Sequence, residues 1–203
     1  MSTSPAASAS AVRNDDQQLR APVLGMVLFV ASEVMFFGGL FGAYFMLRAN
    51  ADEWPPPGSP EIELLLPLAL TLVLLSSSWT QHRALDALER GDRAATTRWL
   101  SLTLALGVAF LVGEGWEWSE FIAGGFTVSS NIFGTLFFTM TGFHGLHLVA
   151  GLAMLLLALS KARGSSPYGA RVGAMEAATL YWHFVDGVWL FLVTSLYVLN
   201  AWQ

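Results

Sequence analysis

Five long apolar stretches alternate with short polar segments along the chain. They cover approximately residues 22–47, 64–81, 99–122, 132–160 and 175–202. A helix needs about 20 mainly apolar residues to cross the hydrocarbon of a bilayer, with a range of about 17–25. Helices also satisfy their own backbone polar groups where there is no water. The pattern therefore predicts an all-α integral membrane bundle of five transmembrane helices.

The composition supports a membrane protein and excludes several classes of site. Of the 203 residues, 54% are hydrophobic and only 12% are charged. The absence of cysteine excludes disulfides, thiolate metal sites and covalently attached c-type haem. No basic cluster indicates a nucleic-acid partner. No internal repeat or inverted duplication is evident, which disfavours the common plan of secondary transporters.

The first residues differ from the rest of the chain. Residues 1–21 are rich in Ser and Ala, include Asp15 and Asp16, and lack the basic start and short apolar core of a signal peptide. We expect residues 1–21 to be a disordered tail and residues 22–203 to form the transmembrane domain.

The basic residues predict the orientation in the membrane. Nine of the ten lie before the first apolar stretch, between the second and third, or between the fourth and fifth: Arg13, Arg20, Arg83, Arg90, Arg93, Arg98, Lys161, Arg163 and Arg171. Only Arg48 falls on the other side. Because cytoplasmic segments carry the excess of Lys and Arg, we expect a cytoplasmic N terminus and a C terminus outside.

Ionisable residues inside the apolar stretches are the main clue to function. They include Glu33 in the first stretch and a set that we expect to form an intramembrane polar network: Glu114, Glu117, His144, His147, His183 and Asp186. His144 and His147 are three residues apart, as are His183 and Asp186, so each pair is expected to share a helix face. The expected depths are similar, which predicts that the groups meet.

Three roles are open for this set. Interhelical hydrogen bonds, at roughly 0.6 kcal/mol each, are the interpretation we favour. A proton relay is the second role. Metal or haem ligation is the third, because intramembrane histidines can bind a metal or clamp a haem.

Four motifs carry a family resemblance. They are SEVMFFGGLFGAYF from Ser32, WPPPG from Trp54, TGFHGLHLVAG from Thr141 and EAATLYWHFVDGVWLFL from Glu176. With them, the chain from residue 22 to residue 202 resembles subunit III of the haem-copper cytochrome c oxidases. Members commonly have seven helices, and the five expected here resemble the short bacterial form that begins at the third.

The resemblance implies an accessory, non-catalytic subunit of a proton-translocating oxidase. Haem and copper would belong to partner subunits I and II, with none in this chain, which would pack on subunit I, bind phospholipid and sustain proton uptake and turnover stability. Further small subunits and a larger respiratory supercomplex are compatible with it. The expected location is the bacterial plasma (inner) membrane. Four histidines and no cysteine agree, because they cannot supply the haem and copper sites of a catalytic subunit.

Two positions correspond to functional residues of the family. Glu33 matches the buried, carbodiimide-sensitive glutamate. Arg171 falls where the family places a basic contact with a lipid head group, although its surroundings, SSPYGARVGAM, depart from the family pattern. A guanidinium at the membrane interface suits a phosphate on physical grounds. No position matches a catalytic residue.

Other functions remain open. The same fold serves quinol oxidases and proteins associated with nitric oxide reductase, although the SEVMFF and WPPPG motifs look more like the cytochrome c branch. A more distant alternative is an autonomous membrane haem protein or ion carrier that uses the histidines and carboxylates.

Overall fold

Residues 5–201 are described by a computed structural model, with side chains described from residue 21 onward. The regular secondary structure of this part of the chain is all helical, which confirms the all-α part of the prediction. Five long helices precede a π-helix and a final helical turn: α1 (Pro5–Ala49), α2 (Leu65–Glu89), α3 (Arg93–Ala123), α4 (Ile132–Arg163), α5 (Tyr168–Leu192), η1 (Val193–Val198) and α6 (Leu199–Ala201).

Four segments of the described chain are long and apolar enough to cross a membrane. They are Ala21–Ala49, Arg93–Ala123, Ile132–Arg163 and Tyr168–Ala201, the last of which joins α5, η1 and α6. Helix α2 is outside this group, because its apolar first half is followed by a run of hydroxyl and amide side chains between residues 76 and 81. The fifth crossing and the orientation stay predictions.

Helix α1 begins earlier than the sequence indicated. Its backbone is helical from Pro5, before the apolar stretch that the sequence placed from residue 22, and the division into a tail of residues 1–21 and a transmembrane domain stays a prediction. This stretch contains several alanines and other residues of good helix propensity, which can extend a helix already formed by the apolar segment. The first four residues lie outside the described chain.

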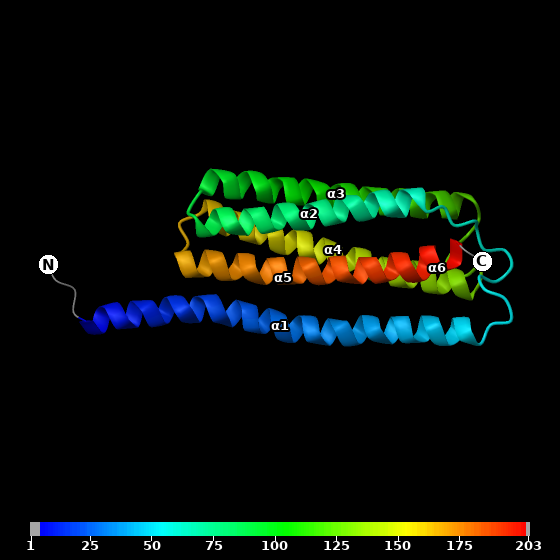
Figure 1. Ribbon diagram of the computed structural model, residues 1–203, viewed down its shortest axis with the longest axis horizontal. Helices are drawn as coiled ribbons and strands as arrows, with labels where there is room; N and C mark the ends of the chain where they lie inside the picture. Colours follow the sequence, from blue (N-terminus) through cyan, green and yellow to red (C-terminus); the bar gives the residue numbers. More distant parts are fainter. Residues whose placement is uncertain (1–4, 202–203) are drawn as a thin grey trace.

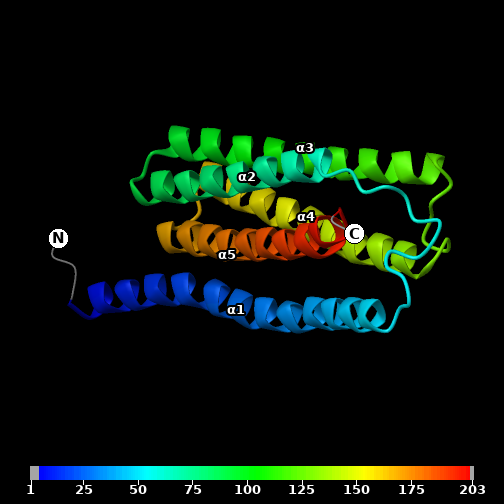
Figure 2. The same cartoon turned by 45° about the vertical axis from the view of Figure 1, so that its right-hand side comes forward.

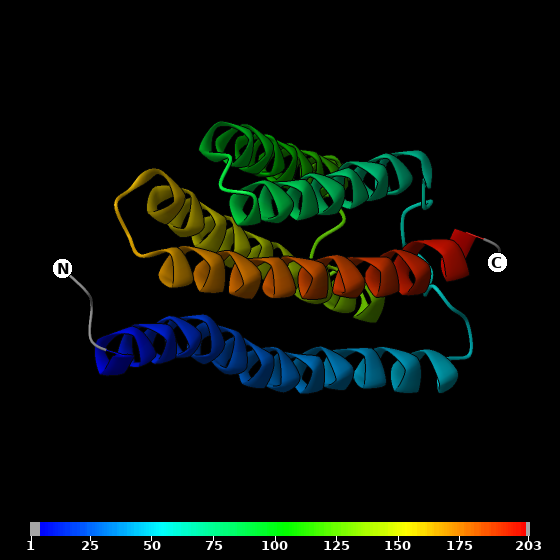
Figure 3. The same cartoon turned by 60° about the vertical axis from the view of Figure 1, so that its left-hand side comes forward.

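Helix α5 is the central element of the bundle. It packs against α1, α2 and α4, while α2 also pairs with α3 and α3 with α4. Helix α1 lies along one side of the bundle, separated from α2 and α3 by α5 (Figure 1). Two rotated views show the same arrangement (Figures 2 and 3). The start of α1 lies at the same end as the α2–α3 and α4–α5 connections, and the C-terminal end lies opposite.

Two helices begin with side-chain caps. Asp92 precedes α3 and accepts a hydrogen bond from the Ala95 amide at 2.9 Å. Asn131 precedes α4 and accepts one from the Gly134 amide at 2.8 Å. Since the first amides of a helix have no intrahelical partner, these contacts determine where each helix starts.

Hydroxyl groups on α2 accept hydrogen bonds from the indole N–H groups of two tryptophans of α5. Trp182 Nε1 donates to Ser77 Oγ at 2.9 Å, and Trp189 Nε1 donates to Thr71 Oγ1 at 3.0 Å. The Trp182 ring is fully buried and lies against Gly151 of α4, where an added Cβ would be only 3.0 Å away. Hydroxyls of α2 therefore help to hold the central helix, and both tryptophans keep a partner for their N–H.

The C-terminal end of the bundle is held by a second polar group. Tyr44 Oη donates to the Ser195 carbonyl within η1 at 2.5 Å. Asn200 Nδ2 donates to the Leu196 carbonyl at 2.8 Å, and Arg48 Nη1 donates to Asn200 Oδ1 at 3.0 Å. Backbone carbonyls around the π-helix thus gain partners from outside the helical ladder, which ties the end of α1 to the end of the chain.

Candidate functional site

A glutamate of α1 and a histidine of α4 form a pair beside α5. His147 Nε2 lies 3.0 Å from Glu33 Oε2. The Phe36 and Phe37 rings lie 6.1 and 4.9 Å from the imidazole, measured between centroids. Tyr181 Oη of α5 donates to the backbone carbonyl of His147 at 3.0 Å. Three helices therefore position one carboxyl–imidazole pair in apolar surroundings.

The other ring nitrogen restricts the protonation state of this pair. His147 Nδ1 lies 2.7 Å from the Phe143 carbonyl oxygen. A carbonyl only accepts hydrogen bonds, so Nδ1 carries a proton. Nε2 then either accepts from a protonated Glu33 or, as imidazolium, donates to its carboxylate. Both arrangements have no net charge, and a proton can move between them without leaving the pair.

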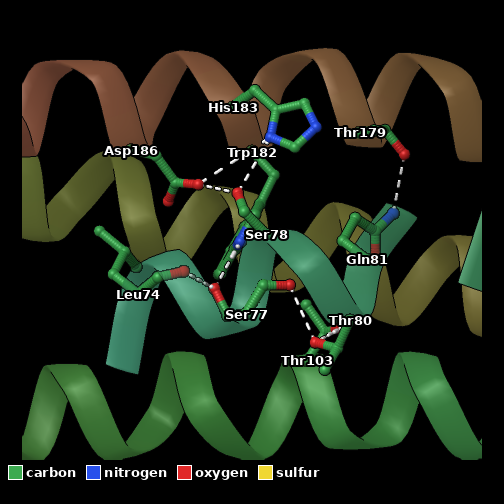
Figure 4. A network of polar contacts seen from close by, with 10 residues as sticks. All are labelled: Leu74, Ser77, Ser78, Thr80, Gln81, Thr103, Thr179, Trp182, His183 and Asp186. Carbon is green, nitrogen blue, oxygen red and sulfur yellow. Dashed lines mark hydrogen bonds and ion pairs between the residues drawn. The ribbon is translucent and has the colours of Figure 1, made fainter. Parts of the chain in front are cut away.

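A second group joins α2 to α5 (Figure 4). Ser78 Oγ donates to Asp186 Oδ2 and lies 2.9 Å from His183 Nδ1. His183 and Asp186 are one turn apart, and their facing atoms Nδ1 and Oδ2 are 3.9 Å from each other. Because the hydroxyl has a single proton, donation to Asp186 requires His183 Nδ1–H to donate to the serine oxygen. Ser78 is thus the link between imidazole and carboxylate.

The exposure of the members of this second group differs. The side chain of Asp186 is buried, and its Oδ1 has no hydrogen-bond partner among the described residues. The side chain of His183 is 46% exposed at the surface of the bundle. The imidazole therefore borders the surface of the bundle, while the carboxyl remains enclosed.

His144 lies apart from His147. It is fully buried, its ring stacks on Trp189 at 5.2 Å and meets the edge of Phe110 at 5.8 Å. Neither ring nitrogen has a hydrogen-bond partner in the described part of the chain. His144 and His147 are about 60° apart around α4, and they contact different neighbours: His144 packs against α3 and α5, whereas His147 reaches α1.

Two carboxyls of α3 lie in a different part of the bundle. Tyr197 Oη of η1 donates to Glu117 Oε2 at 2.6 Å. Glu114, one turn earlier, is only 5% exposed, and its Oε1 has no hydrogen-bond partner among the described residues. Its Oε2 faces α4, where a Cβ on Gly145 would lie 3.2 Å away. This carboxyl is buried against a helix that offers it no donor.

Arg171 lies in the first turns of α5. Its guanidinium carbon is 5.9 Å from the centroid of the Tyr168 ring, and the Nε atom is buried without a hydrogen-bond partner in the described structure. The side chain is half-buried. Its charge therefore lies at the surface near the end of the bundle at which α1 begins.

The expected meeting of all these groups does not occur. The structure brings Glu33 to His147 and His183 to Asp186, places His144 in aromatic packing, and keeps Glu114 and Glu117 one turn apart on α3. Similar depth along parallel helices does not bring side chains together, since each group also needs to face the same neighbour.

Ser78 is the residue that sequence reasoning missed. Its neighbours Ser76, Ser77 and Thr80 bond back to carbonyls of their own helix at 2.6–2.9 Å. The usable signal was spacing, because Thr71, Ser78 and Gln81 recur at intervals of seven and three residues, which places them on one face of the helix. Gln81 likewise donates to Thr179 of α5 at 2.9 Å.

The chemistry available here is proton exchange and hydrogen bonding. Within residues 21–201, no group of three or more His, Cys, Asp or Glu side chains is arranged to hold a metal ion. His147 and His183 each keep at least one ring nitrogen engaged in the described structure.

Comparison with known proteins shows a clear relationship. The sequence model of the family described as "Cytochrome c oxidase subunit III" matches residues 14–201. The chain is 40% identical over 178 residues to cytochrome c oxidase subunit 3 of Synechocystis sp., covering 87% of this chain and 75% of that relative. It is 40% identical over 179 residues to the Thermostichus vulcanus protein of that name, covering 88% and 87%. A probable cytochrome c oxidase subunit 3 of Nocardia farcinica is 36% identical over 200 residues, covering 97% and 98%.

Proposed function

Because the chain belongs to the cytochrome c oxidase subunit III family, we propose that within its oxidase complex it is a non-catalytic, accessory subunit without redox centres. Haem and copper belong to partner subunits I and II in this proposal. The chain packs on subunit I, retains phospholipid there and sustains proton uptake and turnover stability.

The proposed membrane topology has five crossings. Helix α2 crosses as well, since it packs between two membrane-length segments, α3 and α5, along most of its length. The N terminus is cytoplasmic and the C terminus outside, in a bacterial plasma membrane. The basic connections at one end of the bundle, against Arg48 at the other, support this orientation.

The exposed outer face of α1 is the surface on which we propose that a partner subunit docks. Large apolar side chains are exposed along it, among them Leu24, Leu28, Met35 and Met46. Gly38, Gly39 and Gly42 add an unfilled surface, because a Cβ on any of them would meet no atom within 4 Å. Small residues let transmembrane helices approach closely, so this face suits a helix of subunit I.

A groove between α1 and α5 supports retention of lipid. It has a volume of about 420 Å³ and is lined mainly by phenylalanines, namely Phe37, Phe41, Phe45, Phe184 and Phe191. Arg171 precedes Phe184 by 13 residues on α5, which is about 20 Å along the axis. An acyl chain in the groove and a phosphate near Arg171 would therefore lie on one helix at different depths.

The Glu33–His147 pair supports a role in proton handling. It is neutral as a whole and holds an exchangeable proton within a 3.0 Å contact. A subunit beside a proton entrance can use such a pair to keep a proton available without placing a net charge in lipid.

Removal of the chain from purified oxidase tests the proposed role. We expect initial turnover to persist and then to decay faster than in the intact complex, with the haem spectrum unchanged at the outset. Immediate and complete loss of activity, or loss of haem together with the chain, would contradict an accessory role.

Substitution of Arg171 tests the lipid contact. Arg171→Gln should lower the phospholipid that copurifies with the complex, whereas Arg163→Gln, an exposed arginine at the end of α4, should not. Equal phospholipid in the two variants would exclude Arg171 as the head-group contact.

A further inference from the structure

The outer surface of α3 and α4 contains a groove that the proposed function does not use. Its volume is about 510 Å³, within the range of small-molecule sites. Leu111 and Trp118 of α3 and Phe143, Leu146 and Val149 of α4 supply most of its apolar lining. Leu146 is 64% exposed, so the groove opens to the surroundings of the bundle.

Glycines shape the floor of this groove. Gly142 and Gly145 of α4 face the side chains of α3, and a Cβ on Gly142 would lie 3.1 Å from the Trp118 ring. Gly115 of α3 borders the groove from the other side, where a Cβ would meet no atom within 4 Å. The hollow therefore exists because three positions lack side chains.

One polar side chain stands out in the apolar lining. Glu114 borders the groove and is only 5% exposed. Its Oε1 has no hydrogen-bond partner among the described residues. The ion pairs found in the described structure involve other carboxyls. A buried carboxyl without a donor is costly, and an occupant of the groove could supply that donor.

The depth of Glu114 restricts the chemistry of the occupant. Nine residues separate it from the end of α3 at Ala123, which is about 14 Å of helix. The charged head group of a phospholipid stays at the interface, and a charged amine is costly at hydrocarbon depth. A neutral hydroxyl on an apolar body can donate a hydrogen bond at this depth without bringing a charge.

We propose that the groove between α3 and α4 binds a neutral, hydroxyl-bearing lipid whose hydroxyl donates to the Glu114 carboxyl while its apolar body fills the space beside Gly115, Gly142 and Gly145. This site is separate from the α1–α5 groove and from Arg171. It does not depend on the proposed accessory role.

Photolabelling of the whole purified oxidase tests the proposal. The probe is a diacylglycerol with a photoreactive acyl chain, and the matched probe has the free hydroxyl converted to a methyl ether. We expect the first probe to label peptides from residues 111–118 and 138–149. The methyl ether should label them about fivefold less, as expected for the loss of one hydrogen bond.

Three variants locate the site. Glu114→Leu removes the acceptor, and Gly115→Leu fills the groove without a clash at Cβ. Each should lower labelling by about fivefold or more. Glu120→Gln changes an exposed carboxyl of the same helix and should leave labelling within about twofold. Copurified phospholipid should be unchanged in all three, which separates this site from the Arg171 contact.

Several results would overturn the proposal. Equal labelling by the two probes, or labelling that survives Gly115→Leu, would exclude a hydroxyl-specific site in this groove. A photo-crosslink from position 146 to another polypeptide of the intact oxidase would show that a protein covers it. If Glu114→Leu fails to assemble, Gly115→Leu and the methyl ether probe on the unaltered complex still test whether the groove binds the hydroxyl-bearing lipid.

Discussion

His147 Nε2 of α4 lies 3.0 Å from Glu33 Oε2 of α1, and the other ring nitrogen, Nδ1, lies 2.7 Å from the Phe143 carbonyl oxygen one turn earlier. This carbonyl gives the imidazole a fixed orientation. The pair therefore works as one neutral unit that joins α1 to α4, and its coupling can be measured.

A double-mutant cycle should detect that coupling. Glu33→Gln and His147→Ala should each destabilise the folded chain, and together they should cost less than the sum, with a coupling of about 0.6–1.7 kcal/mol. Unfolding in mixed micelles of mild detergent and SDS measures each step. Ser32→Ala is the control, since Ser32 Oγ bonds only the Phe29 carbonyl of its own helix. A coupling near zero would mean that the contact contributes no stability.

The serine bridge predicts a difference between two neighbouring hydroxyls. Ser78→Ala leaves Asp186 and His183 without their shared partner and should destabilise by about 1–3 kcal/mol. Ser76→Ala removes only a bond to its own helix at Leu72 and should stay within about 0.5 kcal/mol. The same SDS titration compares them. Equal effects would argue that Ser78 does not connect the helices.

Close packing at Gly107 predicts a steric effect. A Cβ there would lie 2.7 Å from Leu152 Cδ2 and 2.8 Å from the Trp182 ring. Gly107→Ala should therefore destabilise by about 1–3 kcal/mol in spite of the better helix propensity of alanine.

Gly39→Ala is the matched control for this effect, because its Cβ would point into open space. In the separated chain it should be neutral or stabilising by up to about 1 kcal/mol. In the intact oxidase it should weaken retention of the chain if α1 docks on a partner helix, which size-exclusion chromatography at increasing detergent can measure. Unchanged retention would place the partner contact elsewhere.

The C-terminal network predicts local rather than global opening. Asn200→Ala removes the side chain that donates a hydrogen bond to the Leu196 carbonyl and accepts one from the Arg48 guanidinium. Amide hydrogen exchange across residues 193–201 should become faster, while exchange in α3 and α4 stays unchanged. Thr194→Ala is the control, because Thr194 is exposed and bonds only Leu190 of its own helix. Equal exchange in both variants would mean that Asn200 does not hold the π-helix.

The sequence by itself determined the elements and the family. Long apolar stretches require helices in lipid, and they located most helix ends to within three residues, whereas α1, α3 and α5 begin, and α2 ends, six or more residues beyond the apolar stretch. The motifs around Glu33, His147 and Asp186 indicated the subunit III family, which the comparisons confirm. Both kinds of information are local, because they depend on the order of residues along one segment.

Only the tertiary structure decided which polar groups meet. The rotation of each helix about its axis directs His147 to Glu33 and His144 into aromatic packing, although the two histidines are three residues apart. Ser78 bridges His183 and Asp186 because α5 places both side chains beside it. Glu114 Oε1 has no donor among the described residues, and the position of α4 that faces this carboxyl is a glycine, Gly145. Helix rotation and pairing follow from packing over the whole bundle, so no single segment encodes them.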